Sequence, residues 1–362
     1  MVLLIFIYPN YYFNNLKETI IQHLVCPICS KKFSVKSTKK KSDEILNGTL
    51  TCLKNHKFPI KNGIPRFVVD KSKGFVQTEN SFSSKWKNYN RTYHSQRWFN
   101  VQKRLFLERF GWNTISNLNM FLKTRTRILD AGTGVGNSAK LFSSNPKADV
   151  FAIDASESII FAYKKYGRIP NIHFLQADIQ KLPFKKNFFD FICSDQVLHH
   201  TKNTERSFKM LTKLLAKKGM ISIYVYKIKG QIREYTDNFI RKSTVKMTEK
   251  QCIEFSRDMA LLGKNLSKIK KTITIPKDIP LLQIKAGTYD VQRFIYWNFL
   301  KCWWSKDGPF EQSVATNFDW YFPEYAYRHN PKEVKNWFKK SKLRISHFNE
   351  IESGISVNGV KT

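Results

Sequence analysis

Short hydrophobic runs alternate with helical patterns through the middle of the chain. The stretches SESIIFAYKKYG and ERSFKMLTKLLAKKG repeat apolar residues at helical spacing. We predict that the second helix ends at Lys217, Lys218 and Gly219, because basic residues and glycine are typical of helix C-termini. Strands that alternate with helices indicate a parallel sheet with its ligand across the carboxyl ends of the strands. The predicted strands lie within residues 128–130, 150–156, 171–178, 188–200 and 219–227.

The first of these runs leads into a glycine-rich turn, ILDAGTGVGNSAKLF, at residues 128–142. Glycines at positions 132, 134 and 136 let the chain leave a strand, turn tightly and approach a ligand with no Cβ in the way. Taken alone, such a turn also suits a purely structural strand-to-helix connection.

Acidic residues follow the next two runs. Asp154 comes 18 positions after Gly136, where a carboxylate can accept both hydroxyls of an adenosine ribose, and Asp178 ends the third run. A nicotinamide dehydrogenase is the runner-up for this segment, but that class spaces its glycines G-x-G-x-x-G, whereas this chain has G-x-G-x-G.

Together, DAGTGVG, Asp154, ADIQKLPF, FDFICSDQVLHH and the strand after LLAKKGM resemble the class I S-adenosylmethionine-dependent methyltransferases, particularly the subgroup of quinone-biosynthesis enzymes. The resemblance implies an α/β, Rossmann-like fold: a mostly parallel seven-stranded sheet with helices on both faces. It also implies that S-adenosylmethionine is the cofactor. The methionine half would meet the loop and the end of the fourth strand, the ribose would meet the end of the second strand, and the adenine that of the third. The residues implied for the methionine half are Asp130, Ala131, Gly132, Thr133, Gly134, Gly136, Asp195 and Gln196. Those implied for the ribose are Asp154 and Ala155, and those implied for the adenine are Asp178 and Ile179.

A second constellation lies near the N-terminus, where Cys26, Cys29, Cys52 and His56 form two knuckles. Three thiolates and an imidazole can supply the four ligands of a tetrahedral structural zinc. The stretch HKFPIKNGIPRFV resembles the small ribbon domain of the tRNA-methyltransferase activator family. Some domains of that type lack a metal, so a zinc-free ribbon with buried thiols is the alternative.

These features divide the chain into a tail, a zinc-ribbon-like module, a helical pre-domain, a methyltransferase domain and a helical, aromatic insertion. The segment ENSFSSKWKNY resembles one that covers the cofactor pocket in bacterial small-molecule methyltransferases. The insertion is too long for an ordinary connection, so we expect it to act as a lid over the acceptor. We also expect PKEVKNWFKKSKL to form the last helix and RISHFNEI and SGISVNGVK a closing strand pair. The predicted boundaries are 1–20, 21–70, 71–119, 120–227 with 330–362, and 228–329.

The net charge of the 362-residue chain is +34, which usually suggests nucleic acid or an acidic surface. The excess is spread along the chain, and its only dense run, KKFSVKSTKKK at residues 31–41, is expected to be a solvated loop. The cysteines outside the knuckles show no paired framework, so we expect a reducing, cytoplasmic setting. MVLLIFIYPNYYF has no basic flank and is broken by Pro9 and Asn10, so we predict neither a signal peptide nor a transmembrane span.

Two acceptor classes remain open. The aromatic lid favours a small molecule such as a sugar, lipid or secondary metabolite, whereas the ribbon and the charge favour a structured tRNA or rRNA. A non-catalytic activator subunit is disfavoured because every cofactor position is filled. His199 and His200 are candidate general bases, although they could equally cap the next helix. The aromatic residues expected to roof the acceptor chamber are Trp297, Trp303, Trp304, Trp320 and Tyr321.

Overall fold

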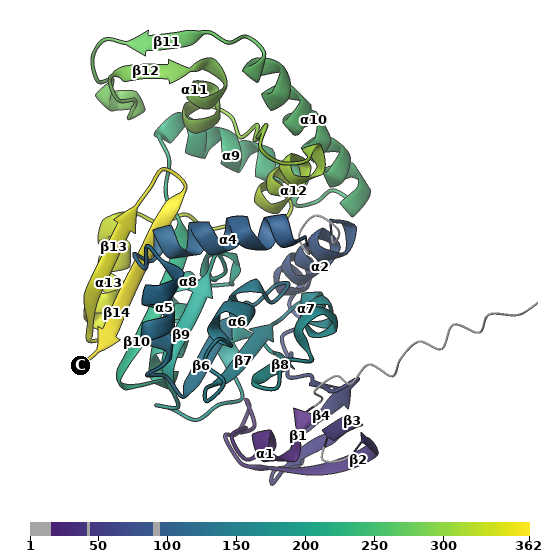
Figure 1. Cartoon of the computed structure of the whole chain (residues 1–362). Coiled ribbons are helices and arrows are strands. Elements are labelled where there is room, and N and C mark those ends of the chain that lie inside the picture. The colour runs from purple at the N-terminus through teal and green to yellow at the C-terminus, as the bar shows by residue number, and fades with distance from the viewer. Residues whose placement is uncertain (1–15, 42–43, 90–94) are drawn as a thin grey trace, which may run out of the picture.

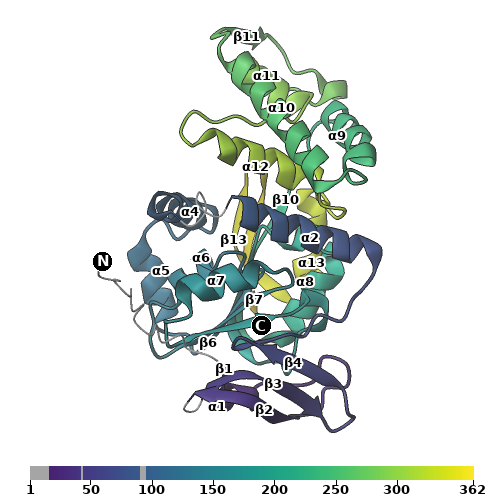
Figure 2. The same cartoon turned by 90° about the vertical axis from the view of Figure 1, so that its right-hand side faces the viewer.

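The computed structural model describes residues 16–41, 44–89 and 95–362. A small N-terminal sheet and a helical lid lie at opposite ends of a central α/β domain (Figures 1 and 2). The expected apolar segment at residues 1–13 lies outside the described residues. In the part of the chain that is described, no helix is both long and apolar enough to cross a membrane.

The N-terminal module is a five-stranded antiparallel sheet with one short helix. Two expectations are corrected here. The module starts at Leu16 rather than at residue 21, because Leu16 pairs with Ile45. The basic run is a strand rather than a loop, because Phe33 and Val35 alternate inward and pair along the next strand. The elements are β1 (Leu16–Lys17), α1 (Glu18–Ile21), β2 (Phe33–Lys41), β3 (Glu44–Cys52), β4 (Lys57–Lys61) and β5 (Ile64–Pro65).

The central sheet has seven strands in the order β13-β14-β10-β9-β6-β7-β8. The pairs from β10 to β8 are all parallel, and β14 is antiparallel to both of its neighbours. The sheet is therefore mostly parallel, and the predicted fold class is confirmed. The strands are β6 (Arg127–Ala131), β7 (Asp149–Asp154), β8 (Ile172–Gln176), β9 (Phe189–Asp195), β10 (Leu215–Tyr226), β13 (Leu343–Glu350) and β14 (Gly354–Lys361).

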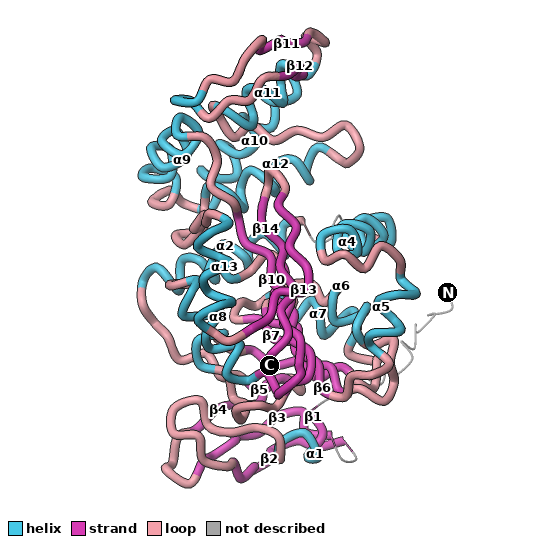
Figure 3. Tube along the Cα trace, turned by 90° about the vertical axis from the view of Figure 1, so that its left-hand side faces the viewer, coloured by secondary structure: helices cyan, strands magenta, loops and turns pink. Residues whose placement is uncertain are grey.

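Helices cover both faces of this sheet, as the edge-on view in Figure 3 shows. Alternate residues of one strand serve opposite faces: Ile128 packs with helices α5 and α6, while Leu129 packs with α8 and α13. Each face thus has its own hydrophobic core. The helices of the domain and its approach are α2 (Lys73–Asn88), α4 (Gln96–Arg109), α5 (Ile115–Leu122), α6 (Asn137–Phe142), α7 (Ser158–Tyr166), α8 (Thr204–Leu214) and α13 (Pro331–Lys340).

The end of α8 differs from the prediction. The helix stops at Leu214, and Leu215 already pairs with Phe189 as the first residue of β10. The basic residues and the glycine form an irregularity in the strand, where Lys218 has a φ of 61°. Pairing with β9 therefore decides the boundary, and the helical pattern of the sequence does not.

The N-terminal module packs directly against the central domain and shares a hydrophobic core with it. Phe67 donates its backbone N–H to Gln176 O at 2.7 Å, and Val25 donates to Pro183 O at 2.9 Å. The cores of the two parts merge, because Phe58 and Phe67 belong to the same buried cluster as Phe184. The module thus covers the edge of the sheet at β8, which would otherwise expose unpaired backbone groups.

The insertion that we call the lid lies between β10 and α13 and has its own core around α10 and α12. The hairpin of β11 and β12 was not predicted. Phe318, Trp320 and Tyr321 are buried in this core, so most of the aromatic residues hold the lid together. The lid elements are α9 (Gln231–Thr244), α10 (Glu249–Ser267), β11 (Thr272–Ile275), β12 (Gly287–Asp290), α11 (Val291–Asn298) and α12 (Phe310–Tyr321).

Candidate functional site

One continuous cavity of about 1340 Å³ lies between the carboxyl ends of the strands, helices α2 and α4, and the lid. We call the part against the strand ends the cofactor half and the part against the lid the acceptor half. The predicted cofactor residues that line the cavity are Gly132, Thr133, Gly134, Asp154, Ala155, Asp178, Ile179, Asp195 and Gln196. Asp130, Ala131 and Gly136 lie behind this wall rather than in it.

The glycine loop has the geometry that its sequence requires. Gly132 and Gly134 have φ values of 91° and 53°, a region in which residues with a Cβ are strained. A Cβ on Gly134 would lie 3.1 Å from the ring of Trp86, closer than an ordinary van der Waals contact, so a larger residue would push against the cover helix α2. Behind the loop, Asp130 accepts a hydrogen bond from Thr133 Oγ1 at 2.6 Å, and burial raises the pKa of Asp130 to about 7. Asp130 therefore fixes the loop from behind.

Asp154 ends β7 with its carboxylate held in place. One oxygen accepts the backbone N–H of Gly134 at 2.9 Å, and the other accepts the N–H and hydroxyl of Ser156 at 2.9 and 2.7 Å. The oxygen that accepts from Gly134 keeps a lone pair for a further donor, whereas the other oxygen already accepts two hydrogen bonds. Because the N–H of Gly134 is already used, this loop does not offer that N–H to a phosphate.

The next strand end adds two more acids to the cofactor half. Asp178 accepts the N–H of Gln180 at 2.9 Å as the cap of a short turn, and burial raises its pKa. Glu79 reaches the same region from α2, with its Oε1 buried and without a hydrogen-bond partner. Burial first, and then Asp154 and Asp178, raise the pKa of Glu79 to about 9. The sequence analysis missed Glu79 because no motif marks it.

Asp195 ends β9 and forms a buried ion pair with Arg109 of α4, with an N–O distance of 2.7 Å. Burial raises the pKa of Asp195 and the arginine opposes that rise. The second carboxylate oxygen of Asp195 is buried and unpartnered. Beside it, Gln196 has a φ of 64°. This strand end therefore places a left-handed backbone and an oriented carboxylate side by side on the cavity wall.

The two candidate histidines differ in their surroundings. His199 is fully buried outside the cavity wall and stacks on Tyr226 with ring centres 3.7 Å apart. His200 lines the cavity, and its Nδ1 lies 2.7 Å from Tyr325 O. A carbonyl only accepts, so Nδ1 carries the proton and Nε2 has the free lone pair. Burial lowers the pKa of His200 to about 4, which keeps the ring neutral near pH 7.

The lid and its neighbours line the acceptor half mostly with residues that the sequence analysis did not single out. Of the five predicted roof aromatics, only Trp303 lines the cavity. Trp320 and Tyr321 are buried in the lid core, and Trp304 packs on Phe310. A chamber faces these helices, but the residues that line it are a polar and aromatic mixture: Lys85, Tyr226, Tyr296, Lys301, Trp303, Thr316 and Asp319.

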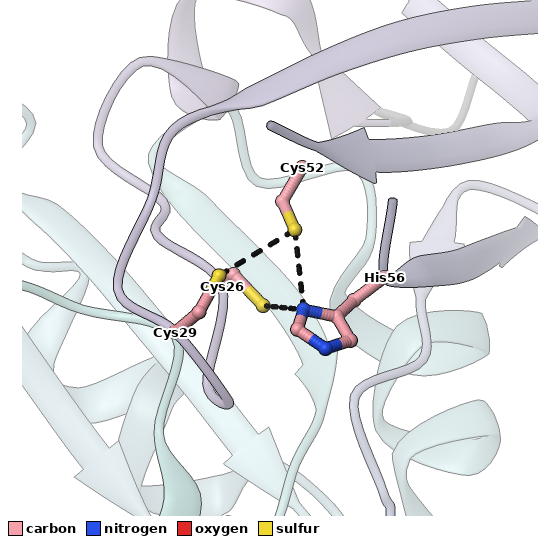
Figure 4. Close-up of side chains that lie close together, drawn as sticks. All are labelled: Cys26, Cys29, Cys52 and His56. Atoms are coloured by element: carbon pink, nitrogen blue, oxygen red, sulfur yellow. Dashed lines mark hydrogen bonds between the residues drawn. The ribbon is translucent and has the colours of Figure 1, made fainter. Parts of the chain in front are cut away.

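The predicted metal ligands come together in the N-terminal module (Figure 4). Donor atoms of Cys26, Cys29, Cys52 and His56 all lie within 4.8 Å of one another. Cys52 Sγ is 3.3 Å from His56 Nδ1 and 3.6 Å from Cys29 Sγ, and Cys26 Sγ is 3.6 Å from His56 Nδ1. These separations match the edges of a tetrahedron around an ion with ligand bonds of about 2.0–2.3 Å. The donor set therefore fits zinc.

Comparison with known proteins gives a consistent result for the central segment. Residues 129–223 match the family model described as a methyltransferase domain. The chain is 29% identical over 118 residues to the ubiquinone/menaquinone biosynthesis C-methyltransferase of Coxiella burnetii, covering 31% of this chain and 47% of that protein. It is 33% identical over 97 residues to the malonyl-acyl-carrier protein O-methyltransferase of Legionella pneumophila, covering 26% and 34%.

Among solved structures, the magnesium protoporphyrin IX methyltransferase of Synechocystis is 14% identical, with coverage of 80% of this chain and 100% of that one and a TM-score of 0.43. The chain spans about half or less of the length of the curated relatives it matches. The family model begins in β6 and ends in β10. The segment with the glycine loop and the acidic strand ends is therefore similar to methyltransferase domains, and the ribbon and the lid lie outside the family match.

Proposed function

We propose that the protein is an S-adenosylmethionine-dependent methyltransferase that acts on a small molecule held under the lid. The observation that carries this proposal is the continuous cavity, which joins a cofactor half at the strand ends to an acceptor half under the lid. A methyl donor and its acceptor must meet in one water-poor space, and a shared cavity satisfies that requirement.

The charge of the cofactor half supports this cofactor over a dinucleotide. Asp154, Asp178 and Asp195 line it, and their carboxylates favour a ligand with cationic sulfonium and ammonium groups over a pyrophosphate. Unpartnered buried oxygens of Glu79 and Asp195 are available for such a ligand. In this proposal, Asp154 and Ala155 hold the ribose, Asp178 and Ile179 the adenine, and the glycine loop with Asp195 and Gln196 the methionine half.

When bound, S-adenosylmethionine supplies an electrophilic methyl group, so the chain has to orient the acceptor, exclude water and accept a proton where the acceptor loses one. Orientation of this kind contributes roughly 7–11 kcal/mol. The chain offers His200 Nε2 as the proton acceptor, because Nδ1 is fixed on Tyr325 O. We assign no chemical role to His199, since it stacks behind the wall.

A small acceptor has more support than RNA. The basic strand β2 belongs to the ribbon, at the end of the molecule away from the lid (Figure 2). Asp70 and Asp178 line the cavity, and their carboxylates would repel a phosphate backbone. The relatives with printed substrates are also named for small-molecule or carrier-bound acceptors.

We also propose that the cluster of Cys26, Cys29, Cys52 and His56 holds a structural zinc ion. Two of the thiols are buried, and the four donors lie on two knuckles that flank the β2–β3 hairpin. Bound zinc would fix these knuckles beside the edge of the sheet that the ribbon covers.

Calorimetry with S-adenosylhomocysteine tests the proposed cofactor site. Asp154→Asn is expected to weaken binding by about ten- to a hundredfold, because it exchanges a charged hydrogen-bond acceptor for a neutral one of the same shape. Gly134→Val is expected to weaken it further, since the new side chain meets Trp86. The matched control is Asp149→Asn at the opposite end of β7, outside the cavity, with affinity within about twofold of wild type. If S-adenosylhomocysteine does not bind the wild type, or binds all variants with equal affinity, the proposed cofactor site is wrong.

A further inference from the structure

A lysine with unusual surroundings lines the acceptor half. Lys301 follows α11, is only 5% exposed and contributes to the cavity wall. Its Nζ donates to Tyr296 Oη at 3.3 Å and lies 4.4 Å from the ring centre of Trp320. Burial lowers the pKa of Lys301 to about 7. A buried ammonium is costly without a counter-ion, so this position calls for an explanation.

The carboxylates around Lys301 already form ion pairs with other residues. The charged and titratable groups that face it are Arg233, Lys229, Asp237, Asp319, Tyr296 and Cys302. Asp237 pairs with Arg233 at 2.9 Å, and both side chains are buried. Asp319 pairs with Lys85 of α2 at 2.9 Å. Within the described ranges, no carboxylate lies within 4.0 Å of the Lys301 ammonium. Two acids thus face four cations. Arg233 and Lys85 pair with the acids, Lys229 Nζ donates to the carbonyls of Lys227 and Ser353, and Lys301 is left without a carboxylate.

A series of contacts and one charge interaction connects this lysine to the cofactor half. Trp86 lies over Gly134, and Lys85 Nζ is 4.5 Å from the Trp86 ring centre. Asp319 then pairs with Lys85 and faces Lys301 from the lid. The cofactor loop, the cover helix and the lid therefore meet at the Lys85–Asp319 pair. A small acceptor that contacts these residues lies between Lys301 and the place proposed for the methyl donor.

From this geometry we infer that Lys301 is the counter-ion for an acidic group of the acceptor, either a carboxylate or a phosphate. The inference rests on the proposed function and narrows its substrate class to anionic small molecules. An anion at Lys301 completes the charge pairing in a site shielded from water, where such a pair is strong. An uncharged acceptor would leave the ammonium unpaired. The acidic group anchors the acceptor at Lys301, and the rest of the acceptor extends towards the cofactor half.

Probe binding to the full-length protein saturated with S-adenosylhomocysteine tests this inference. The probes are benzoate, phenyl phosphate and, as the uncharged counterpart, benzyl alcohol. We expect the wild type to prefer at least one anion to benzyl alcohol, and the preferred anion separates a carboxylate from a phosphate anchor. Lys301→Met should weaken the binding of that anion by about tenfold or more, while its affinity for benzyl alcohol stays within about twofold of the wild-type value. Lys301→Arg should restore most of the anion affinity, because it restores the charge.

The matched control is Lys250→Met, at an exposed lid lysine outside the cavity, which should bind all probes as the wild type does. Anions that bind the wild type no better than benzyl alcohol, or a Lys301→Met variant with unchanged anion affinity, would overturn the inference. If S-adenosylhomocysteine itself does not bind, the proposed function fails separately. The same anion titration on the free protein then still decides the role of Lys301.

Discussion

The cofactor half and the acceptor half of the cavity are built in different ways. The cofactor half comes from successive strand ends, so Gly134, Asp154, Asp178 and Asp195 follow one another within one stretch of chain. The acceptor half comes from segments far apart in sequence: Lys85, His200, Tyr226, Lys301 and Asp319 belong to a cover helix, two strand ends and a lid. The difference teaches that cofactor recognition here is a local property of βα turns, whereas acceptor recognition depends on docking of the lid.

The two halves also have different supports. The ribbon holds the cofactor half, because Arg66 donates to Gln176 Oε1 at 2.7 Å and lies 3.2 Å from Glu157, just after Asp154. The lid holds the acceptor half through Lys85 and Asp319. Disturbing the ribbon should therefore weaken cofactor binding, and disturbing the lid should weaken acceptor binding.

The largest effect is expected from loss of the metal cluster. Cys52→Ser should reduce the zinc content from one ion per chain to none and lower the melting temperature by about 10 °C or more, because structural zinc contributes on the order of 10 kcal/mol to a small module. Affinity for S-adenosylhomocysteine should fall as well, through Arg66. Metal analysis, calorimetry and thermal unfolding measure these changes. The control Cys252→Ser alters a buried thiol of the lid core and should keep the zinc.

An intermediate effect is expected from acid at His200, in the acceptor half. Its folded pKa of about 4 lies below the ordinary value of 6.5, so the neutral ring contributes its full stability above pH 6.5. That contribution is lost as the pH falls towards 4, by roughly 3 kcal/mol in total. His200→Gln should therefore lose about that much less stability than wild type between pH 7 and pH 4 in denaturant unfolding. A proton-resonance titration of His200 with a midpoint near 6.5 would refute the assignment.

The smallest effect separates two neighbouring tryptophans of the lid. Trp303 lines the cavity, and its backbone is fixed by Asn317 whatever its side chain is. Trp304 packs on Phe310 away from the cavity. Trp303→Ala should weaken benzyl alcohol binding by about three- to tenfold, because it removes an aromatic contact. Trp304→Ala should leave that affinity unchanged, and equal losses in both variants would mean that the lid acts only through its fold.

The sequence alone determined the order of the central strands and helices, the closing strand pair and most of the residues that line the cofactor half. This was possible because strand periodicity, positive-φ glycines and strand-end carboxylates are local features that a sequence displays directly. It also determined the cysteine and histidine set, since two short knuckles carry all four donors. Two local predictions were nevertheless wrong. The end of α8 depended on pairing of β10 with β9, and the strand character of β2 depended on pairing with β3.

Only the tertiary structure decided what faces the acceptor. Lys301 and Asp319 carry no motif, and their sequence neighbours Trp304 and Trp320 were the more conspicuous candidates. Glu79 and Lys85 lie on an ordinary polar helix until that helix docks over the cavity. The choice between His199 and His200 depended on one carbonyl of Tyr325 and one ring of Tyr226. The burial and the charge pairing of a side chain depend on segments that are far apart in the chain, so a short stretch of sequence does not reveal them.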